Sequence, residues 1–392
     1  MDMTDSMVKT SEPRALIACV MMYMLAPVGM SLIPLLVGAG SDNLGLTQKQ
    51  AGFLATADLA GIALAAVICT IWIRTWAWRP LAVVGIAIIV LSNLASIQVD
   101  SYALLCVMRF ITEFGQGIIF SLALVSIGDT SKPDRYFAFG IGLTVFISIA
   151  FFLVLPGLIQ EHGLPALFIT HALVALAVLP LVLWFPASAL PLPETSAKDH
   201  GSMLPLFVAM VAFMFFMATE GGLWAYMERI GNNAGFTPEF VGQALAATQV
   251  TSVMGALLAS AVSTRYGRTL PIVAGSILFI VAMFMLMGKG TVTYVSAVCL
   301  TQFCYIFVVP YLLLICVELD QTGRLYVLSI AFKLGGMSLG PSVVAQFLAP
   351  GSYTAVSWVG SVFLMTTLLL VVPLAARLDN KQRISTELEA PA

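Results

Sequence analysis

Long apolar stretches follow one another along this chain, and short polar turns separate them. Each stretch is close to the ~20 residues that a helix needs to cross a ~30 Å hydrocarbon core. A membrane-spanning strand would need only ~10 residues of alternating polarity, and that pattern is not seen. The chain is therefore predicted to form twelve transmembrane helices, at 14–38, 49–73, 79–97, 102–128, 136–159, 164–185, 204–227, 239–262, 270–288, 292–316, 323–347 and 353–376.

A polar segment after the sixth stretch divides the pattern into two halves. Residues 187–203 combine prolines, small polar residues and charges, which is typical of a linker. We expect an N-terminal six-helix bundle over 1–186, a cytoplasmic linker over 187–203, and a C-terminal six-helix bundle over 204–392. No other connection is long enough to hold a soluble domain.

The two halves are related by a repeat. Arg74 recurs as Arg265 and Asp129 as Asp320, both at an offset of 191 residues (265 − 74 and 320 − 129). Membrane transporters are commonly built from internal repeats, with their solute site at the repeat interface near the bilayer midplane. The repeat therefore indicates a transporter built from two copies of one unit.

The composition agrees with a membrane location. The 392 residues are 60% hydrophobic and 10% charged, far from the composition of soluble domains. Lys49, Arg229 and Lys289 lie on one predicted side of the membrane, and thirteen Lys and Arg residues lie on the other. Because basic loops stay in the cytoplasm, both termini are expected inside, without a cleaved signal peptide. We expect a multi-pass protein of the bacterial inner (plasma) membrane, with no nucleic-acid partner.

The sequence also argues against several kinds of chemistry. All six cysteines fall inside predicted spans without metal-ligand spacing, so neither a disulfide framework nor a bound metal is expected. No phosphate-binding Gly-x-x-x-x-Gly-Lys-Ser/Thr loop and no hydrolase motif is present. We therefore expect a protein that is not an enzyme, requires no cofactor and is not driven by its own ATP hydrolysis.

Two segments carry a resemblance to a known family. Ser263-Thr-Arg-Tyr-Gly-Arg-Thr-Leu-Pro271 resembles the Gly-x-x-x-Asp-Arg-x-Gly-Arg signature of the major facilitator superfamily, with Thr264 at the acidic position. Arg109 to Gly115, in the fourth span, is similar to that family's Arg-x-x-Gln-Gly-x-Gly element. The Gly-Pro element that many drug/proton antiporters of the family carry in span five is missing.

The resemblance implies an all-α fold of two pseudo-symmetric six-helix bundles around a central cavity, working by alternating access. It also implies a cytoplasmic gating motif, for which the candidates are Arg74, Arg265, Gly267, Arg268, Asp129, Arg135, Asp320 and Arg324.

Ionisable side chains inside the spans are the main functional candidates. Placing such a side chain at the middle of the membrane costs ~2.5 to 3.5 kcal/mol of free energy, so each one is a candidate for a functional role. The five that stand well inside spans are Asp58, Arg109, Glu113, Glu220 and Lys333. Three acids against two bases leave one carboxylate without a fixed cation. This balance suits a proton carrier.

Asp58 and Arg109 are expected at similar depth, roughly 12 to 14 Å below the outer end of their helices. They could therefore pair. Arg109 and Glu113 are i,i+4 neighbours on one helical face, so that Arg109 could choose between two carboxylates. Glu113 is our first candidate for the protonated group, with Asp58 and Glu220 as further candidates. The alternative is a static ion cluster that only fixes helix register.

Candidate solute-binding residues lie mainly in the second half. Met214 and Met217 belong to a methionine stripe that continues to Glu220 and Trp224; it could form an apolar wall for a solute or serve as helix packing. Lys333 and Arg109 could bind an anionic solute, or Lys333 could pair with Glu220. Polar side chains in spans eight and ten could orient a solute or bond to neighbouring helices: Gln249, Gln302 and Tyr305.

These observations predict a proton-coupled secondary transporter of a small organic molecule, with an organic anion favoured. The alternatives are proton-driven efflux of lipophilic compounds, Cu(I) transport through Met210 and Met214, and a membrane sensor that transports nothing. The expected partners are the solute, protons and the lipid bilayer, and the expected functional unit is a monomer.

Overall fold

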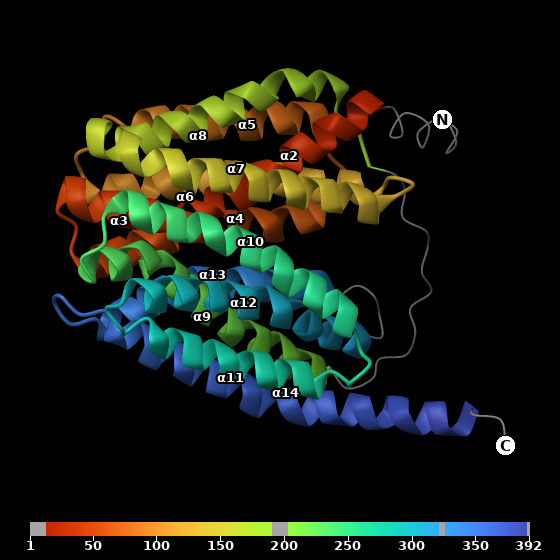
Figure 1. The fold of residues 1–392 in the computed structure, drawn as a ribbon. Coiled ribbons are helices and arrows are strands. Elements are labelled where there is room, and N and C mark those ends of the chain that lie inside the picture. The colour runs from red at the N-terminus through yellow and green to blue at the C-terminus, as the bar shows by residue number, and fades with distance from the viewer. Residues whose placement is uncertain (1–12, 190–202, 321–325, 390–392) are drawn as a thin grey trace. The chain divides into compact units, whose positions relative to one another are not determined.

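The computed structural model describes residues 13–189, 203–320 and 326–389. Within these residues every regular element is a helix, which confirms the all-α class (Figure 1). Eleven of the described helices are long and apolar enough to cross a membrane, and Thr269–Met285 is a shorter apolar helix. The helices thus account for the predicted spans, although the start of the span predicted at 323–347 lies outside the described residues.

The chain divides into two compact units, Met1–Thr195 and Ser196–Ala392. The helices of the N-terminal unit are α2 Pro13–Ser31, α3 Ile33–Leu44, α4 Gln48–Trp72, α5 Trp78–Ser96, α6 Tyr102–Gly128, α7 Pro133–His162, α8 Pro165–Val178 and the 3₁₀ helix η1 Leu179–Trp184. Those of the C-terminal unit are α9 Leu204–Asn233, α10 Pro238–Val262, α11 Thr269–Met285, α12 Thr291–Leu319, α13 Tyr326–Phe347 and α14 Thr354–Glu389. Residues 190–202, most of the predicted linker, lie outside the described residues.

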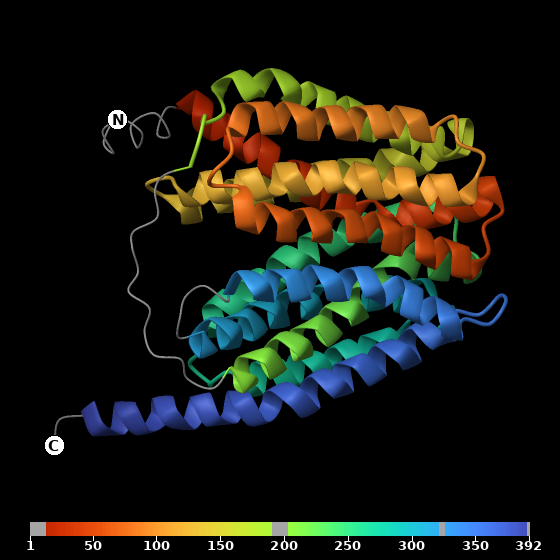
Figure 2. The same ribbon diagram turned by 180° about the vertical axis from the view of Figure 1, so that it is seen from behind.

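The 191-residue repeat extends to the helices and their packing. Adding 191 to the first residue of α2, Pro13, gives Leu204 at the start of α9, and adding it to the last residue of α6, Gly128, gives Leu319 at the end of α12. In the N-terminal unit α6 packs against α4 and α5; in the C-terminal unit α12 packs against α10 and α11. The pairs α5–α8 and α11–α14 also correspond; Figure 2 shows α14, in dark blue, from behind.

The sequence supplies capping residues at the starts of helices α4 and α10. Thr47 and Gln50 form a capping box at the start of α4, in which each side chain bonds to the other residue's backbone N–H. Thr237 accepts a hydrogen bond from the N–H of Phe240 at the start of α10, and Pro238 occupies the first turn. These caps satisfy backbone donors that the helix itself leaves unpaired.

The first and last predicted spans differ from the structure. The span predicted at 14–38 is two helices, because Pro34 lacks a backbone N–H and its ring excludes the carbonyl four residues earlier. The chain turns tightly there, with the N–H of Leu32 bonded to the carbonyl of Gly29 at 2.9 Å. The last span was predicted to end at residue 376, but α14 continues to Glu389.

Glycines allow the closest helix contacts in both units. A Cβ atom on Gly61 of α4 would lie 2.2 Å from the carbonyl oxygen of Phe110 on α6. In the C-terminal unit, a Cβ on Gly336 of α13 would lie 2.1 Å from the carbonyl oxygen of Met214 on α9, and one on Gly340 would lie 2.2 Å from that of Ala218. Small residues let membrane helices approach until their backbones touch, which is how such helices associate in lipid.

We predict that Gly336→Ala destabilises the protein and that Gly335→Ala does not. The added methyl group at 336 would meet the α9 backbone, and overpacking costs about 1–3 kcal/mol. No heavy atom lies within 4 Å of a Cβ on Gly335, so alanine there should be neutral or slightly favourable for the helix. Thermal unfolding of the detergent-purified protein tests this; equal melting temperatures for the two variants would contradict the contact.

Candidate functional site

The buried charges of the N-terminal unit lie where α4 and α6 cross. Asp58 on α4 and Arg109 on α6 form an ion pair, with 3.6 Å between Arg109 Nε and Asp58 Oδ1. Gly61, one turn after Asp58, lets the α4 backbone touch that of Phe110, the residue after Arg109. The close glycine contact thus brings the carboxylate and the guanidinium group together.

Arg109 is only 1% exposed to solvent. Its guanidinium carbon lies 4.8 Å from the ring centroid of Phe168 on α8, an arrangement that stabilises a cation through the electrons of the ring. Among the described residues, Arg109 Nε and Nη2 and Asp58 Oδ1 have no hydrogen-bond partner, since 3.6 Å is too long for one. The buried pair therefore keeps unused hydrogen-bonding capacity.

Glu113 lies one turn along α6 from Arg109 and is 3% exposed. No hydrogen bond reaches its carboxyl group from the described residues, but it interacts electrostatically with both Asp58 and Arg109. The three side chains therefore form one buried cluster of two carboxyl groups and one guanidinium group. If both carboxyl groups were ionised, the cluster would carry a net negative charge in a region with little water.

A second polar chain crosses the N-terminal unit beside this cluster, and the sequence pattern did not predict it. Gln116 on α6 donates Nε2 to the carbonyl of Ala26 on α2 at 3.0 Å, and its Oε1 lies 2.6 Å from His171 Nε2 on α8. Gly29 makes room for it, because a Cβ there would overlap the Gln116 amide. Gln116 thus ties α2, α6 and α8 together, and His171 has a structural hydrogen bond.

In the C-terminal unit, Glu220 on α9 accepts a hydrogen bond from Gln302 on α12 at 2.6 Å. Glu220 is 2% exposed, and its second oxygen, Oε2, has no partner among the described residues. Tyr305, one turn from Gln302, lies close enough to Glu220 to interact electrostatically and stacks against Phe216 with 6.4 Å between ring centroids. These side chains form a polar and aromatic cluster within that unit.

The other predicted solute-binding residues lie in different surroundings. Met217 and Trp224 are buried, Met214 is half-buried, and Gln249 is half-buried with its Nε2 3.4 Å from Thr248 Oγ1. Lys333 on α13 is half-buried and makes no ion pair with any described residue. The alternative pairing of Lys333 with Glu220 does not form.

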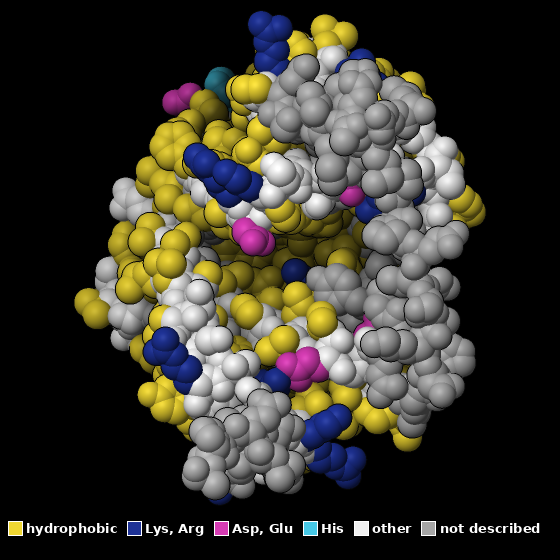
Figure 3. All heavy atoms as spheres, turned by 90° about the vertical axis from the view of Figure 1, so that its right-hand side faces the viewer, with side chains coloured by type: hydrophobic (Ala, Val, Ile, Leu, Met, Phe, Trp, Pro, Cys, Tyr) yellow, Lys and Arg dark blue, Asp and Glu magenta, His cyan; other side chains and the backbone are white. Residues whose placement is uncertain are grey.

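In the N-terminal unit, the candidate gating residues Arg74, Asp129 and Arg135 lie near helix ends, on the side where α2 begins and η1 ends. Figure 3 looks onto this side, and charged side chains stand out there among hydrophobic ones. Arg74 and Asp129 form an ion pair at 3.3 Å. Arg135 is exposed and lies 5.6 Å from the ring centroid of Phe139. Arg324 lies outside the described residues.

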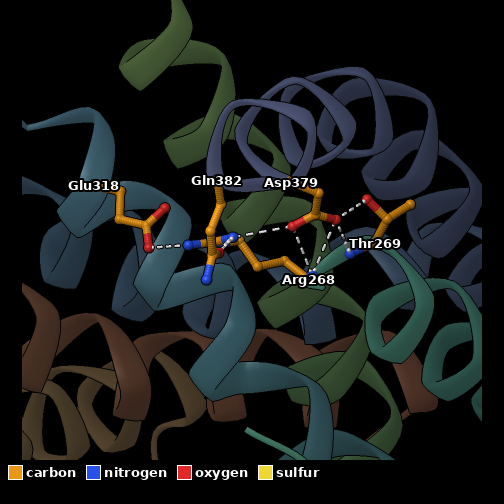
Figure 4. Close-up of polar contacts among 5 residues, drawn as sticks. All are labelled: Arg268, Thr269, Glu318, Asp379 and Gln382. Atoms are coloured by element: carbon orange, nitrogen blue, oxygen red, sulfur yellow. Dashed lines mark hydrogen bonds and ion pairs between the residues drawn. The ribbon is translucent and has the colours of Figure 1, made fainter. Parts of the chain in front are cut away.

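In the C-terminal unit Arg268, rather than Arg265, is the buried arginine of the turn before α11 (Figure 4). Its Nη2 bonds to Glu318 at the end of α12, and its Nη1 bonds to Asp379 Oδ1 at 3.0 Å and to Gln382 Oε1 at 2.8 Å, both on α14. Burial acts to lower the pKa of Arg268, but its contacts with Glu318 and Asp379 outweigh this effect and raise that pKa.

Asp379 also fixes the backbone of the same turn. It accepts hydrogen bonds from the backbone N–H groups of Arg268 and Thr269 and from Thr269 Oγ1, at 2.7 to 3.0 Å. Gly267, with φ +73°, brings the backbone close, because a Cβ there would lie 2.7 Å from Asp379 Oδ2. A carboxylate at the N-terminus of α11 is also favoured by the helix dipole. Asp379 and Glu318 were not among the sequence candidates.

No group of three or more His, Cys, Asp or Glu side chains that could bind a metal ion occurs in the described part of the chain.

The sequence model of the Major Facilitator Superfamily matches residues 16–341. A search of curated proteins found no match. Among solved structures, the chain is similar to a variant of the nucleoside transporter NupG, with 12% identity and a TM-score of 0.73, covering 93% of this chain and 99% of that one.

It is also similar to a bacterial homologue of the human lysosomal transporter Spinster in an inward-facing, unoccupied conformation. The identity is again 12%, the TM-score is 0.68, and the match covers 97% of this chain and 100% of that one. At such low identity, these two likenesses show the fold.

We predict that Asp379→Ala releases the turn at residues 265–269. Hydrogen bonds to a charged acceptor contribute about 1.5–3 kcal/mol each, so their loss should let the turn open. Limited trypsin digestion of the purified protein, followed by mass spectrometry, should show cleavage after Arg265 or Arg268 at least roughly tenfold faster than in the wild type. Asn380→Ala, at an exposed neighbouring position, is the control and should cleave at the wild-type rate. Equal rates for all three proteins would refute the role of Asp379.

Proposed function

Since the chain belongs to the major facilitator superfamily, whose members are secondary transporters, we propose that it moves a small organic molecule across the membrane in a proton-coupled cycle. The observation that carries the coupling is the buried cluster of Asp58, Arg109 and Glu113. We place the protein in the inner membrane of a bacterium, with its termini in the cytoplasm and a monomer as the working unit.

Charge balance is the argument for a proton. One guanidinium group neutralises one carboxylate, and a proton on the second carboxyl group leaves the buried cluster without net charge. In our proposal this proton resides on Glu113, because Asp58 already holds the ion pair with Arg109 and no described residue bonds to Glu113. Ionisable groups inside membrane spans commonly serve as such proton relays.

The geometry also provides a way for the proton to change the conformation. Glu113 and Arg109 stand four residues apart on one face of α6, so an ionised Glu113 competes with Asp58 for the same guanidinium group. Loss of the proton would then weaken the contact between α4 and α6, and protonation would restore it. A ligand that binds the two arrangements differently shifts their populations, which is the basis of alternating access.

For the solute we favour an organic anion. Lys333 is a half-buried cation without an ion-pair partner among the described residues, and a carboxylate on the solute would supply one. Met210 and Met217 are buried within the C-terminal unit, so much of the methionine stripe is used in packing rather than in lining a surface for lipophilic compounds. Gln302, Gln249 and Tyr305 remain our candidates for orienting the solute.

Proton-driven efflux of lipophilic compounds is the second candidate. The stack of the buried Phe216 on the half-buried Tyr305, beside Glu220, favours it, because aromatic faces and a carboxylate suit an organic cation. The two candidate functions differ in the charge of the solute. Measuring whether organic anions or organic cations bind to the protein can therefore distinguish them.

We predict that Glu113→Gln abolishes solute accumulation driven by an imposed pH gradient in proteoliposomes. Glutamine keeps the shape of a protonated glutamate but cannot release a proton, so solute exchange between equal concentrations should continue. Glu161→Gln, at an exposed carboxylate near the end of α7, is the matched control and should accumulate solute normally. If Glu113→Gln retains the wild-type pH dependence, the cluster is structural.

A thermal-shift screen should show stabilisation by small organic acids that is lost in Lys333→Gln. A ligand at a hundred times its dissociation constant stabilises the state it binds by about 2.7 kcal/mol, which is readily measured. Lys333→Arg keeps the charge and should keep part of the response. Stabilisation of the wild type only by hydrophobic cations would refute the anion proposal and support the efflux candidate.

A further inference from the structure

Two arginines from different helices each contact one of two consecutive residues, Trp184 and Phe185, at the end of η1. The guanidinium carbon of Arg14, on α2, lies 5.8 Å from the ring centroid of Trp184. Arg79, on α5, donates its Nε to the carbonyl oxygen of Phe185 at 2.6 Å. η1 packs against both α2 and α5, and the N–H of Trp78 bonds to the carbonyl of Ala187. The packing of three elements therefore fixes both guanidinium groups beside one short segment.

This site lies where the membrane-spanning part of the unit ends. Trp184 is 42% exposed and its neighbour Leu183 is 75% exposed. Trp72 and Trp76, at the end of α4 on the same side of the unit, are also exposed and stack on each other. In membrane proteins, tryptophans at helix ends lie at the level of the lipid headgroups. In a bilayer, we therefore expect Leu183 and Trp184 to face acyl chains and ester groups, and the two arginines to lie at the depth of the phosphates.

The positive charge of the site is not balanced by the described residues. Arg14 and Arg79 are both exposed, and neither forms an ion pair with a carboxylate in the described part of the chain. Arg74, on the same side of the unit, differs because it pairs with Asp129. A guanidinium group has five N–H donors, and the bond to Phe185 uses only one of those of Arg79. Several donors of each arginine therefore have no partner among the described residues.

We propose that Arg14, Arg79 and Trp184 form a binding site for the headgroup of one anionic phospholipid. Guanidinium groups bind phosphate oxygens through paired, charge-assisted hydrogen bonds. The exposed Leu183 and Trp184 provide an apolar surface for the acyl chains of the same molecule, which a free phosphate ion would not use. Basic pockets among membrane helices select anionic lipids in this way. The site is independent of the proton and solute sites proposed above.

Fluorescence quenching by brominated lipids tests the proposal on the full-length protein. The protein is reconstituted in phosphatidylcholine with a small, equal fraction of either phosphatidylglycerol or phosphatidylcholine that is brominated near the headgroup. We expect the anionic brominated lipid to quench tryptophan fluorescence more than the zwitterionic one. Trp184→Phe should remove this excess, because phenylalanine keeps the ring but not the indole emission.

Arg14→Gln and Arg79→Gln should each lower the preference for the anionic lipid by about fivefold. Arg135→Gln is the matched control, because Arg135 is also exposed, lies over an aromatic ring and belongs to the same unit; it should keep the excess. Arg79→Lys keeps the charge and reports whether any loss in Arg79→Gln comes from unfolding, with elution in size-exclusion chromatography as the check.

Equal quenching by the two lipids in the wild type would overturn the proposal. So would an excess that survives in the double variant Arg14→Gln/Arg79→Gln, or one that is lost equally in Arg135→Gln. Millimolar inorganic phosphate should not reverse the excess; if it does, the site binds a free anion and the lipid assignment is wrong.

Discussion

The N-terminal unit is arranged around a guanidinium group that water does not reach. A charge in hydrocarbon is tolerated only where protein groups replace its hydration, and Arg109 receives this from Asp58 on α4 and from the ring of Phe168 on α8. The α4–α6 crossing that brings the carboxylate within reach depends in turn on Gly61, which leaves no side chain between the backbones. The neutralisation of Arg109 therefore depends on the close packing of α4 against α6, and that packing in turn places a charge that must be neutralised.

The two units share the packing of the repeated helices, but their buried polar residues differ. Positions 58 and 113 correspond to Gln249 and Cys304 in the second copy (58 + 191 and 113 + 191), so the second copy lacks the ion cluster. One buried acid of the second copy, Glu220, instead accepts a hydrogen bond from the neutral amide of Gln302. Equivalent helices thus pack in equivalent ways, while one unit holds a charged cluster and the other a cluster of carboxyl, amide and aromatic groups.

The sequence was sufficient to predict the helices, because in lipid each helix must satisfy its own backbone and must be long and apolar. The candidate ion pair was also predictable, since Asp58 and Arg109 stand out in apolar surroundings. Phe168 and Gln116 gave no such signal: the first is an ordinary apolar residue in its span, and the partners of the second come from two other helices. The extension of α14 was missed because residues beyond 376 are polar, and Asp379 has a partner only once α14 reaches the turn before α11.

The buried arginines Arg109 and Arg268 differ in how completely their guanidinium groups are bonded. Both terminal nitrogens of Arg268 are bonded to side chains from α12 and α14, and the same Asp379 holds the backbone beside it, so moving this side chain would break several contacts at once. Arg109 has a carboxylate at 3.6 Å and an aromatic ring, while its Nε and Nη2 lack partners among the described residues. A side chain with unused donors and a second carboxyl group one turn away can change partner at little cost. The incomplete bonding that weakens the Asp58–Arg109 pair as a structural element is therefore what would suit it to the proton-coupled cycle that we propose.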